Sequence, residues 1–147
     1  MEIYTDSSFM EKDQIAGIGL LINDGQKQRS FSNWIFSPSN NYGELFAIYE
    51  AAILSGGKKA TIYTDSQVAL DFIHNNIRLK KREDFKRPGQ FFLYQQMRVL
   101  AYKIRKVNPN ITFEKVKAHR RDFRVAHLNN SMADLLAKRG LSKFMGR

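Results

Sequence analysis

One five-residue string occurs twice in the sequence, and each copy carries an aspartate. Ile-Tyr-Thr-Asp-Ser occupies residues 3–7 and again residues 62–66, which places Asp6 and Asp65 at equivalent positions of two strand-like segments. If these strands are parallel neighbours in equivalent register, the two carboxylates face the same side of the sheet about 4.8 Å apart. Carboxylates that close repel each other unless a cation or a proton lies between them. The pair therefore indicates a metal site, and a helix N-cap is the alternative role for Asp65 alone.

Two further acids lie among small and apolar residues of helix-like segments. Glu44 shares a helical face with three apolar residues, Ala47, Ile48 and Ala51. An acid on the apolar stripe favours a functional role, whereas an acid that only complements the helix dipole from the first turn would point to solvent. Asp134 lies within Asn-Ser-Met-Ala-Asp-Leu-Leu-Ala, where a solvated helix position is the alternative.

Four acids that meet at the carboxyl edge of one sheet would form a hard, oxygen-rich site. Mg²⁺ and Mn²⁺ prefer such oxygen ligands and bridge readily to phosphates. The chemistry that follows from this set of ligands is phosphoryl transfer assisted by two metal ions.

The first third of the sequence predicts three strands joined by short turns. Their expected bounds are Glu2–Phe9, about Ile15–Asn23 and about Gln28–Phe36. Asn23-Asp24-Gly25, between the second and third, is typical of a tight hairpin turn that needs a positive φ. We expect the three strands to form an antiparallel meander.

Helices and strands alternate through the rest of the chain. A helix is expected at about Tyr42–Leu54, a strand at Ala60–Asp65, and a helix of about ten residues from Ser66-Gln67. Helical spacing resumes from Phe92 to Ile104, followed by a strand at Ile111–Val116 and a helix from about Asn129 to Lys138. The order strand, helix, strand predicts a parallel pairing with a right-handed crossover.

Length, composition and charge indicate one compact domain with an anionic partner. The 147 residues suit a single domain, and 43% hydrophobic with 26% charged residues is close to the average of folded proteins. The 24 Lys and Arg against 14 Asp and Glu give a net charge of +10, which favours nucleic acid over an anionic membrane or an acidic protein. Cysteine is absent, which excludes disulfides and thiolate zinc sites.

Residues 78–90 form the most basic segment and are expected to protrude from the surface. This segment, which we call the basic protrusion, has a local net charge of +4 from six basic and two acidic residues. Lysines and arginines there would neutralise backbone phosphates without reading sequence, and a solvated charge run is the alternative.

Five short motifs occur in order along nearly the whole chain. They are Tyr-Thr-Asp-Ser-Ser at Asp6, Asn-Asn-Tyr-Gly-Glu-Leu at Glu44, Tyr-Thr-Asp-Ser-Gln at Asp65, Lys-Val-Lys-Ala-His at His119 and Asn-Asn-Ser-Met-Ala-Asp-Leu-Leu-Ala at Asp134. Each motif alone is weakly specific, but the five in order and with compatible spacing resemble the motif series of the type 1 ribonuclease H family. The chain departs from that series at Ser7, where the family usually has glycine, and His127 competes with His119 as the loop histidine.

This resemblance implies the ribonuclease H-like α/β fold, a five-stranded mixed sheet in the order 3-2-1-4-5 flanked by helices. The implied activity is that of an endoribonuclease which hydrolyses the RNA strand of RNA–DNA hybrids with two Mg²⁺ or Mn²⁺ ions and leaves 5′-phosphate and 3′-hydroxyl ends. Asp6 would bridge both ions, Asp134 would complete the site that activates water, and Glu44 with Asp65 would complete the site that stabilises the departing 3′ oxygen. His119 would assist proton transfer or product release.

The resemblance also implies which residues contact the substrate. One expected group lies near the cleavage site and consists of Ser39, Asn40, Asn41 and Gln67, although turn formation and a polar first helical turn are alternative roles for the asparagines and the glutamine. The other expected group belongs to the basic protrusion and consists of Lys80, Lys81, Arg82, Lys86 and Arg87. Phe85 is a further expected contact, against a sugar.

Three other classes of protein compete with this interpretation. They are a hybrid-binding module without catalysis, another nuclease of the same superfamily, and a basic structural protein. The complete set of four acids argues against a non-catalytic binding module and against a structural protein. Another nuclease of the superfamily is disfavoured by the asparagine pair, Gln67 and the basic protrusion. We further expect one domain over residues 1–147 without an N-terminal hybrid-binding domain, a monomer, a cytoplasmic location and no membrane segment.

Overall fold

The computed structural model describes residues 1–76, 80–116 and 125–146, except for the side chains of 125–127. Five strands form one mixed sheet in the order β3-β2-β1-β4-β5, as predicted. The strands are β1 (Glu2–Met10), β2 (Ile15–Asn23), β3 (Gln28–Phe36), β4 (Ala60–Thr64) and β5 (Ile111–Lys115). The helices are α1 (Asn40–Leu54), α2 (Gln67–Ile73), α3 (Pro88–Val107) and α4 (Val125–Phe144), with a 3₁₀ turn, η1 (Arg82–Asp84).

The two copies of Ile-Tyr-Thr-Asp-Ser lie side by side in the sheet. β1 and β4 are parallel, and their register pairs Ile3 with Ile62 and Tyr4 with Tyr63. The rings of Tyr4 and Tyr63 stack with centroids 4.3 Å apart and planes 7° apart. Side chains alternate along a strand, and Asp6 and Asp65 each follow one of these paired tyrosines by two positions. Their side chains therefore face the same side of the sheet. The predicted equivalence of the two strings is therefore confirmed.

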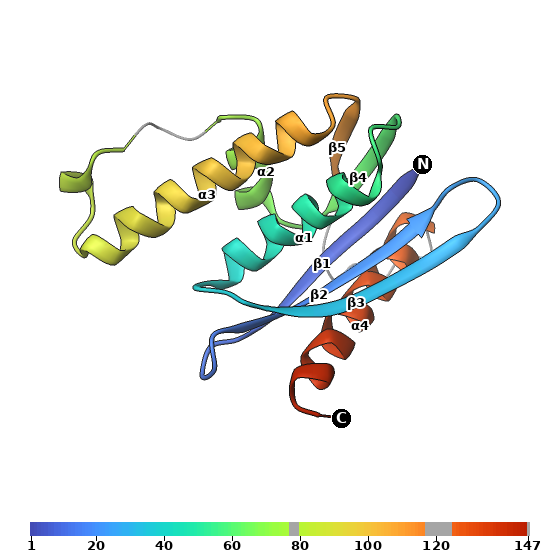
Figure 1. Cartoon of the computed structure of the whole chain (residues 1–147), viewed down its shortest axis with the longest axis horizontal. Coiled ribbons are helices and arrows are strands. Elements are labelled where there is room, and N and C mark those ends of the chain that lie inside the picture. The colour runs from blue at the N-terminus through green and yellow to red at the C-terminus, as the bar shows by residue number, and fades with distance from the viewer. Residues whose placement is uncertain (77–79, 117–124, 147) are drawn as a thin grey trace.

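Helices cover both faces of the sheet and give it two apolar cores. α1 lies directly on one face with α3 packed against it, while α4 crosses the other face (Figure 1). The larger core combines Ile3, Ile18 and Ile62 of the sheet with buried residues of α1, α2 and α3. The smaller core lies under α4 and contains Tyr4 and Leu21. The alternation of Ile3 and Tyr4 between the two cores follows from the strand period of two.

Glycines let α4 approach the sheet at backbone distance. A Cβ atom added to Gly17 or Gly19 of β2 would collide with backbone atoms of α4, and one added to Gly140 would collide with the Asn33 carbonyl of β3. The Ser32 hydroxyl donates to the Leu136 carbonyl at 2.7 Å, which ties the helix to the edge strand. α4 is therefore held in a fixed place over β1 and β2.

Several elements differ in extent from the expected ones. α1 begins at Asn40 rather than Tyr42 because the Ser39 side chain accepts from the Tyr42 N–H at 3.1 Å and caps the helix there. α4 continues past the expected end at Lys138, because Gly140, a residue that commonly ends helices, is needed here for close packing. It also begins at Val125 rather than at about Asn129. α2 has seven residues rather than about ten, and its chain turns away at Asn75, where φ is 59°.

The three N-terminal strands form the predicted antiparallel meander. The connection between β2 and β3 is a loop of residues 24–27 rather than a tighter turn, closed by the Asp24 N–H donating to the Lys27 carbonyl, and Gly25 has the predicted positive φ. Among the described residues, no helix is both long enough and apolar enough to span a bilayer.

Candidate metal centre

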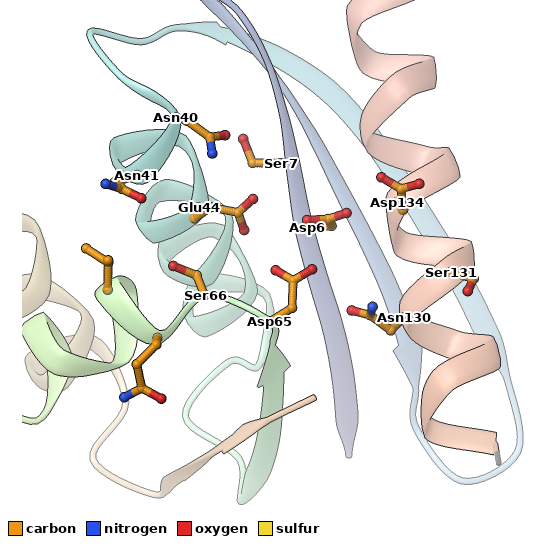
Figure 2. Close-up of a pocket in the computed structure, with 12 residues that line it drawn as sticks. Asp6, Ser7, Asn40, Asn41, Glu44, Asp65, Ser66, Asn130, Ser131 and Asp134 are labelled. Carbon is orange, nitrogen blue, oxygen red and sulfur yellow. The ribbon is translucent and has the colours of Figure 1, made fainter. Parts of the chain in front are cut away.

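Three carboxylates from distant parts of the sequence meet at one edge of the sheet. Asp6 comes from β1, Glu44 from α1 and Asp65 from the residue after β4, and carboxylate oxygens of all three lie within 4.8 Å of one another. Asp6 and Glu44 are each only 6% exposed. Figure 2 shows their side chains pointing toward one another, and all three line one pocket.

Local structure explains why each acid reaches this point. The parallel register of β1 and β4 sets Asp6 and Asp65 side by side. Glu44 lies on the helical face that also carries the buried Ala47, Ile48 and Ala51, as predicted. It belongs to the second turn of α1 rather than the first, because the Ser39 cap begins the helix earlier, and its burial argues against a solvent-facing role.

The N-cap of α2 is Ser66 and not Asp65. The Ser66 hydroxyl accepts a hydrogen bond from the Ala69 N–H at 3.1 Å. The alternative role of Asp65 as a helix cap is therefore wrong, and its carboxylate belongs to the acidic cluster.

Burial and mutual repulsion make the carboxyls of Asp6 and Glu44 weaker acids than usual. Burial, and next the negative charge of Asp65, raise the pKa of Asp6 from 3.8 to about 7. Burial, and next the charge of Asp6, raise the pKa of Glu44 well above its usual value. The Ser7 backbone N–H donates to both carboxylates and lowers their pKa values, but its effect is smaller. Without a cation, the cluster therefore favours a shared proton over full ionisation.

The cluster has the chemistry of a divalent cation site. Its donors are all carboxylate oxygens, the kind of ligand that hard cations such as Mg²⁺ and Mn²⁺ prefer. The Glu44 Oε2 atom is buried and has no hydrogen-bond partner among the described residues. A buried carboxylate oxygen without a partner is costly, and a cation bound there would compensate it. The three residues therefore fit a metal ion.

Asp134 lies in α4 on the opposite side of Asp6 from Glu44 (Figure 2). It lines the same pocket, of about 460 Å³, and contributes to the raised pKa of Asp6. Its Oδ2 atom is 3.1 Å from Lys138 Nζ, one helical turn further along. Asp134 thus borders the three-carboxylate group without belonging to it.

The pocket brings together some of the expected substrate residues. Asn40, Asn41 and Gln67 line it, whereas Ser39 is not among the lining residues and is the N-cap of α1. The Gln67 amide donates to the Asp71 carboxylate at 2.8 Å.

Five lining residues were not singled out from the sequence as substrate or metal contacts. They are Ser7, Ser66, Val68, Asn130 and Ser131. Asn130 and Ser131 lie one turn before Asp134 on α4, so helical spacing from a suspected ligand was the available signal.

The described basic residues of the protrusion are exposed and lie outside the pocket. Lys80, Lys81, Arg82, Lys86 and Arg87 are all exposed. The Phe85 ring is half-buried and packs against Phe91 and Tyr94, with centroid distances of 5.8 and 5.5 Å, so it serves internal packing rather than standing free for a sugar. Arg78, His119 and the side chain of His127 lie outside the described residues.

Comparison with known proteins assigns the family. The family model for RNase H matches residues 1–142. Ribonuclease HI of Haemophilus influenzae is 29% identical over 141 residues, which cover 95% of this chain and 88% of the relative, and a ribonuclease H of Mannheimia succiniciproducens is 28% identical over 95% and 86%. The crystal structure of RNase H1 from the halophilic archaeon Halobacterium salinarum superposes with a TM-score of 0.71 at 17% identity, covering 97% of both chains. The chain belongs to the RNase H family.

Proposed function

We propose that this protein is an endoribonuclease that hydrolyses the RNA strand of RNA–DNA hybrids and leaves 5′-phosphate and 3′-hydroxyl ends. The observation that carries the proposal is the convergence of the carboxylates of Asp6, Glu44 and Asp65 within 4.8 Å in a chain of the RNase H family. A structure of LC11-RNase H1 in complex with an RNA/DNA hybrid has the same fold, with a TM-score of 0.68 at 18% identity over 98% of both chains, and supports the choice of substrate.

The proposed cofactor is a pair of Mg²⁺ or Mn²⁺ ions. When bound, such ions activate a water nucleophile near neutral pH and stabilise the charge that develops on the leaving oxygen. Asp6 lies between Asp134 on one side and Glu44 with Asp65 on the other (Figure 2), so it is the residue suited to contact both ions. Glu44 and Asp65 would complete one site, and Asp134 the other.

The polar lining of the pocket suits recognition of the sugar edge of a hybrid. An RNA–DNA hybrid carries 2′-hydroxyls on one strand only, and a hydroxyl both donates and accepts hydrogen bonds. The amide side chains of Asn40, Asn41 and Gln67 also both donate and accept, and they line the pocket beside the carboxylates. We assign them to discrimination between RNA and DNA.

The exposed cations of the basic protrusion would bind backbone phosphates. Lysine and arginine at phosphates contribute affinity that depends on salt and not on base sequence. The exposed Lys80, Lys81, Arg82, Lys86 and Arg87 fit this role, and weak sequence preference is the expected consequence. Assistance of proton transfer or product release by His119, a single domain, a monomer and a cytoplasmic location remain predictions from the sequence.

The decisive experiment is the Asp65→Asn variant. This change keeps the size of the side chain but removes one of the three clustered charges, so we expect loss of cleavage with retention of the fold. The assay measures cleavage of labelled RNA–DNA, RNA–RNA and DNA–DNA duplexes with Mg²⁺ or Mn²⁺, and circular dichroism checks folding. Asp13→Asn, at an exposed acid in the turn after β1, is the matched control and should cleave like the wild type.

Each alternative function predicts a different outcome of this assay. Full turnover by Asp65→Asn would refute the assigned metal site. Cleavage of RNA–RNA or DNA–DNA duplexes would indicate another kind of ribonuclease H-like nuclease. Binding of the hybrid by the wild type without cleavage at any metal concentration would indicate a non-catalytic module.

A further inference from the structure

A second pocket opens between the end of α2 and the outer face of α3. Its volume is about 580 Å³, and it shares no lining residue with the pocket of the metal centre. Phe72 and Asn75, at the end of α2, form one wall of the second pocket. Gln67 and Val68, at the start of α2, line the pocket of the metal centre instead. The two pockets therefore lie at opposite ends of this helix.

Helical spacing places the other lining residues on one face of α3. They are Gln95, Arg98, Val99, Tyr102 and Arg105, at offsets of three, four, seven and ten residues from the first. The opposite face of α3 is buried in the core, whereas on this face Val99 is 55% and Tyr102 54% exposed. An aromatic ring and an aliphatic side chain are thus presented to solvent inside a concave surface.

The protein holds both arginines of this pocket in place. The Arg105 guanidinium donates from Nη1 to the Ile73 carbonyl at 2.6 Å and to the Phe72 carbonyl at 3.3 Å, at the end of α2. Both bonds use one nitrogen of a group that carries five N–H donors. The Arg98 guanidinium carbon lies 5.8 Å from the centroid of the Tyr94 ring. Side chains that are positioned in advance lose less entropy when they bind a ligand.

The charge of α3 points to an anionic ligand. Over Pro88–Val107 the helix has four basic residues, Arg98, Lys103, Arg105 and Lys106, and no acidic residue. The Lys106 Nζ atom lies 5.4 Å from the centroid of the Tyr102 ring, so a third cation borders the pocket. Arginine is well suited to phosphate because its planar fork donates two parallel hydrogen bonds.

The uncharged lining favours a nucleotide over other anions. The exposed ring of Tyr102 offers a surface on which a base can stack. The amides of Asn75 and Gln95 both donate and accept hydrogen bonds, as the edges of bases do. An acidic peptide would use the arginines equally well, but a flat ring beside two amides suits a base better than a carboxylate side chain. Bases inside a duplex are stacked on each other, so only an unpaired base can enter.

We propose that this second pocket binds an unpaired nucleotide of single-stranded nucleic acid, with the base on the ring of Tyr102 and a phosphate at Arg98 and Arg105. The site goes beyond the proposed function, because it needs neither metal ions nor the clustered carboxylates. The seven residues of α2 span about 10 Å. A strand that extends unpaired from a bound hybrid would reach the second pocket along this helix.

The test is fluorescence anisotropy of the full chain with short labelled oligothymidylate and oligouridylate of equal length, with a chelator present so that RNA stays intact. We expect Tyr102→Ala to weaken binding about tenfold, the effect of losing one stacked base, and Tyr102→Phe to bind like the wild type. Phe92→Ala removes another exposed ring of α3 that does not line this pocket, and it should bind like the wild type.

A second pair of variants separates the arginine from the net charge. Arg98→Ala and Lys103→Ala each remove one positive charge from an exposed position of α3, but only Arg98 lines the pocket. We expect Arg98→Ala to weaken binding about tenfold, through loss of hydrogen bonds to a charged group, and Lys103→Ala to have a much smaller effect. Thermal unfolding checks that each variant is folded.

The two oligonucleotides share the chemistry that the pocket would recognise, and the one that binds more tightly identifies the strand as RNA or DNA. Wild-type affinity in Tyr102→Ala, or equal losses in Arg98→Ala and Lys103→Ala, would overturn the inference. Tighter binding of an acidic peptide of alternating aspartate and leucine would overturn it in favour of a protein partner.

Cleavage of a hybrid without overhangs separates this inference from the proposed function. Tyr102 does not line the pocket of the metal centre, so Tyr102→Ala should cleave such a hybrid like the wild type. Loss of cleavage in this variant would place the second pocket on the path of the duplex and overturn its assignment to unpaired nucleotides. Absence of cleavage by the wild type would refute the proposed function and leave the binding result standing.

Discussion

At the scale of single residues, the cluster of Asp6, Glu44 and Asp65 lowers the folding stability of the metal-free protein and suits the binding of a cation. Asp6 and Glu44 are almost completely buried and lie beside Asp65, so ionisation of all three is unfavourable in the metal-free protein. A bound cation removes this cost, and binding is therefore coupled to folding stability. Sites of this kind commonly combine strongly shifted pKa values with function.

The raised pKa of Asp6 predicts how stability depends on pH. The pKa of Asp6 is about 7 in the folded, metal-free protein and near 3.8 in the unfolded chain. Between these values the folded state binds more protons, so the contribution of Asp6 to the free energy of unfolding falls as pH rises from about 4 to 7 and is constant above. The expected loss is on the order of a few kcal/mol, and Glu44 acts in the same direction.

Urea unfolding at several pH values with a chelator present measures this effect. The comparison is made against Asp6→Asn, because other titrating groups also change with pH and cancel in the difference. We expect Asp6→Asn to gain stability relative to the wild type at pH 7.5 but not at pH 4, and added Mg²⁺ to remove most of the difference. Parallel pH profiles for the two proteins would contradict the raised pKa.

At the scale of elements, the approach of α4 to the sheet decides where Asp134 lies. Gly17 and Gly19 of β2 face α4 and leave no room for a Cβ atom, so the helix backbone rests directly on the strand. The Tyr4 hydroxyl is also hydrogen-bonded to the Asn129 side chain of α4. The packing of α4 on the sheet therefore places Asp134 at the pocket, on the opposite side of Asp6 from Glu44.

A methyl group added at Gly19 of β2 should therefore displace α4 and with it Asp134 of the metal centre. In Gly19→Ala the new Cβ meets backbone atoms of Ala133 and Ala137, which cannot rotate away as a flexible side chain would. We expect a loss of roughly 1–3 kcal/mol in the free energy of unfolding. Weaker Mg²⁺ binding should accompany it because α4 moves with Asp134.

Thermal unfolding and calorimetric titration measure the two effects. Gly89→Ala is the control, because nothing lies within 4 Å of the added atom at the start of α3, and it should not lower stability. Unchanged stability and Mg²⁺ affinity in Gly19→Ala would show that α4 does not depend on this close approach.

At the scale of the whole molecule, the chain has a net charge of +10, but its pocket is lined by four acids. The positive surface attracts a polyanion, while the local negative charge of the pocket attracts the cations that the reaction needs. The described basic residues of the protrusion are exposed and lie outside the pocket, so their contribution to affinity can be removed without altering the carboxylates that line the pocket.

Charge reversal in the basic protrusion should weaken binding of the hybrid. We expect Lys80→Glu, Lys81→Glu and Lys86→Glu together to reduce affinity and to lower the slope of its salt dependence by roughly one for each phosphate that the protein no longer neutralises. Fluorescence anisotropy with a labelled hybrid, at several salt concentrations and with Ca²⁺ in place of Mg²⁺ or Mn²⁺, measures both.

A second triple variant controls for net charge. Each Lys→Glu change alters the charge by two, so the triple variant carries +4 instead of +10. Lys27→Glu, Lys58→Glu and Lys59→Glu change the net charge equally but lie at the turns before β3 and β4, at the other end of the sheet from Asp65. If both triple variants lose affinity equally, the effect comes from overall charge and the protrusion has no special role.

The sequence by itself determined the strand pattern, the acids and their pairing. Strand alternation and the repeated string are local properties, and identical strings in neighbouring strands align because they present the same side chains to the same two cores. The register of Asp6 with Asp65 could therefore be predicted, and so could the face of Glu44. The order of the strands was predicted from the family resemblance and is confirmed.

Only the tertiary structure decided the properties that depend on contacts between distant segments. Three such properties are the burial that raises the pKa of Asp6, the close approach of Ser7 to Gly43 and the internal packing of Phe85. Each arises between residues that sequence spacing does not relate. The C-terminal end of α4 was placed too early for the same reason, since glycine commonly ends a helix by local preference but Gly140 fits here against β3. Local preferences describe what a segment can do alone, and packing free energy, summed over the whole fold, overrides them where backbones must touch.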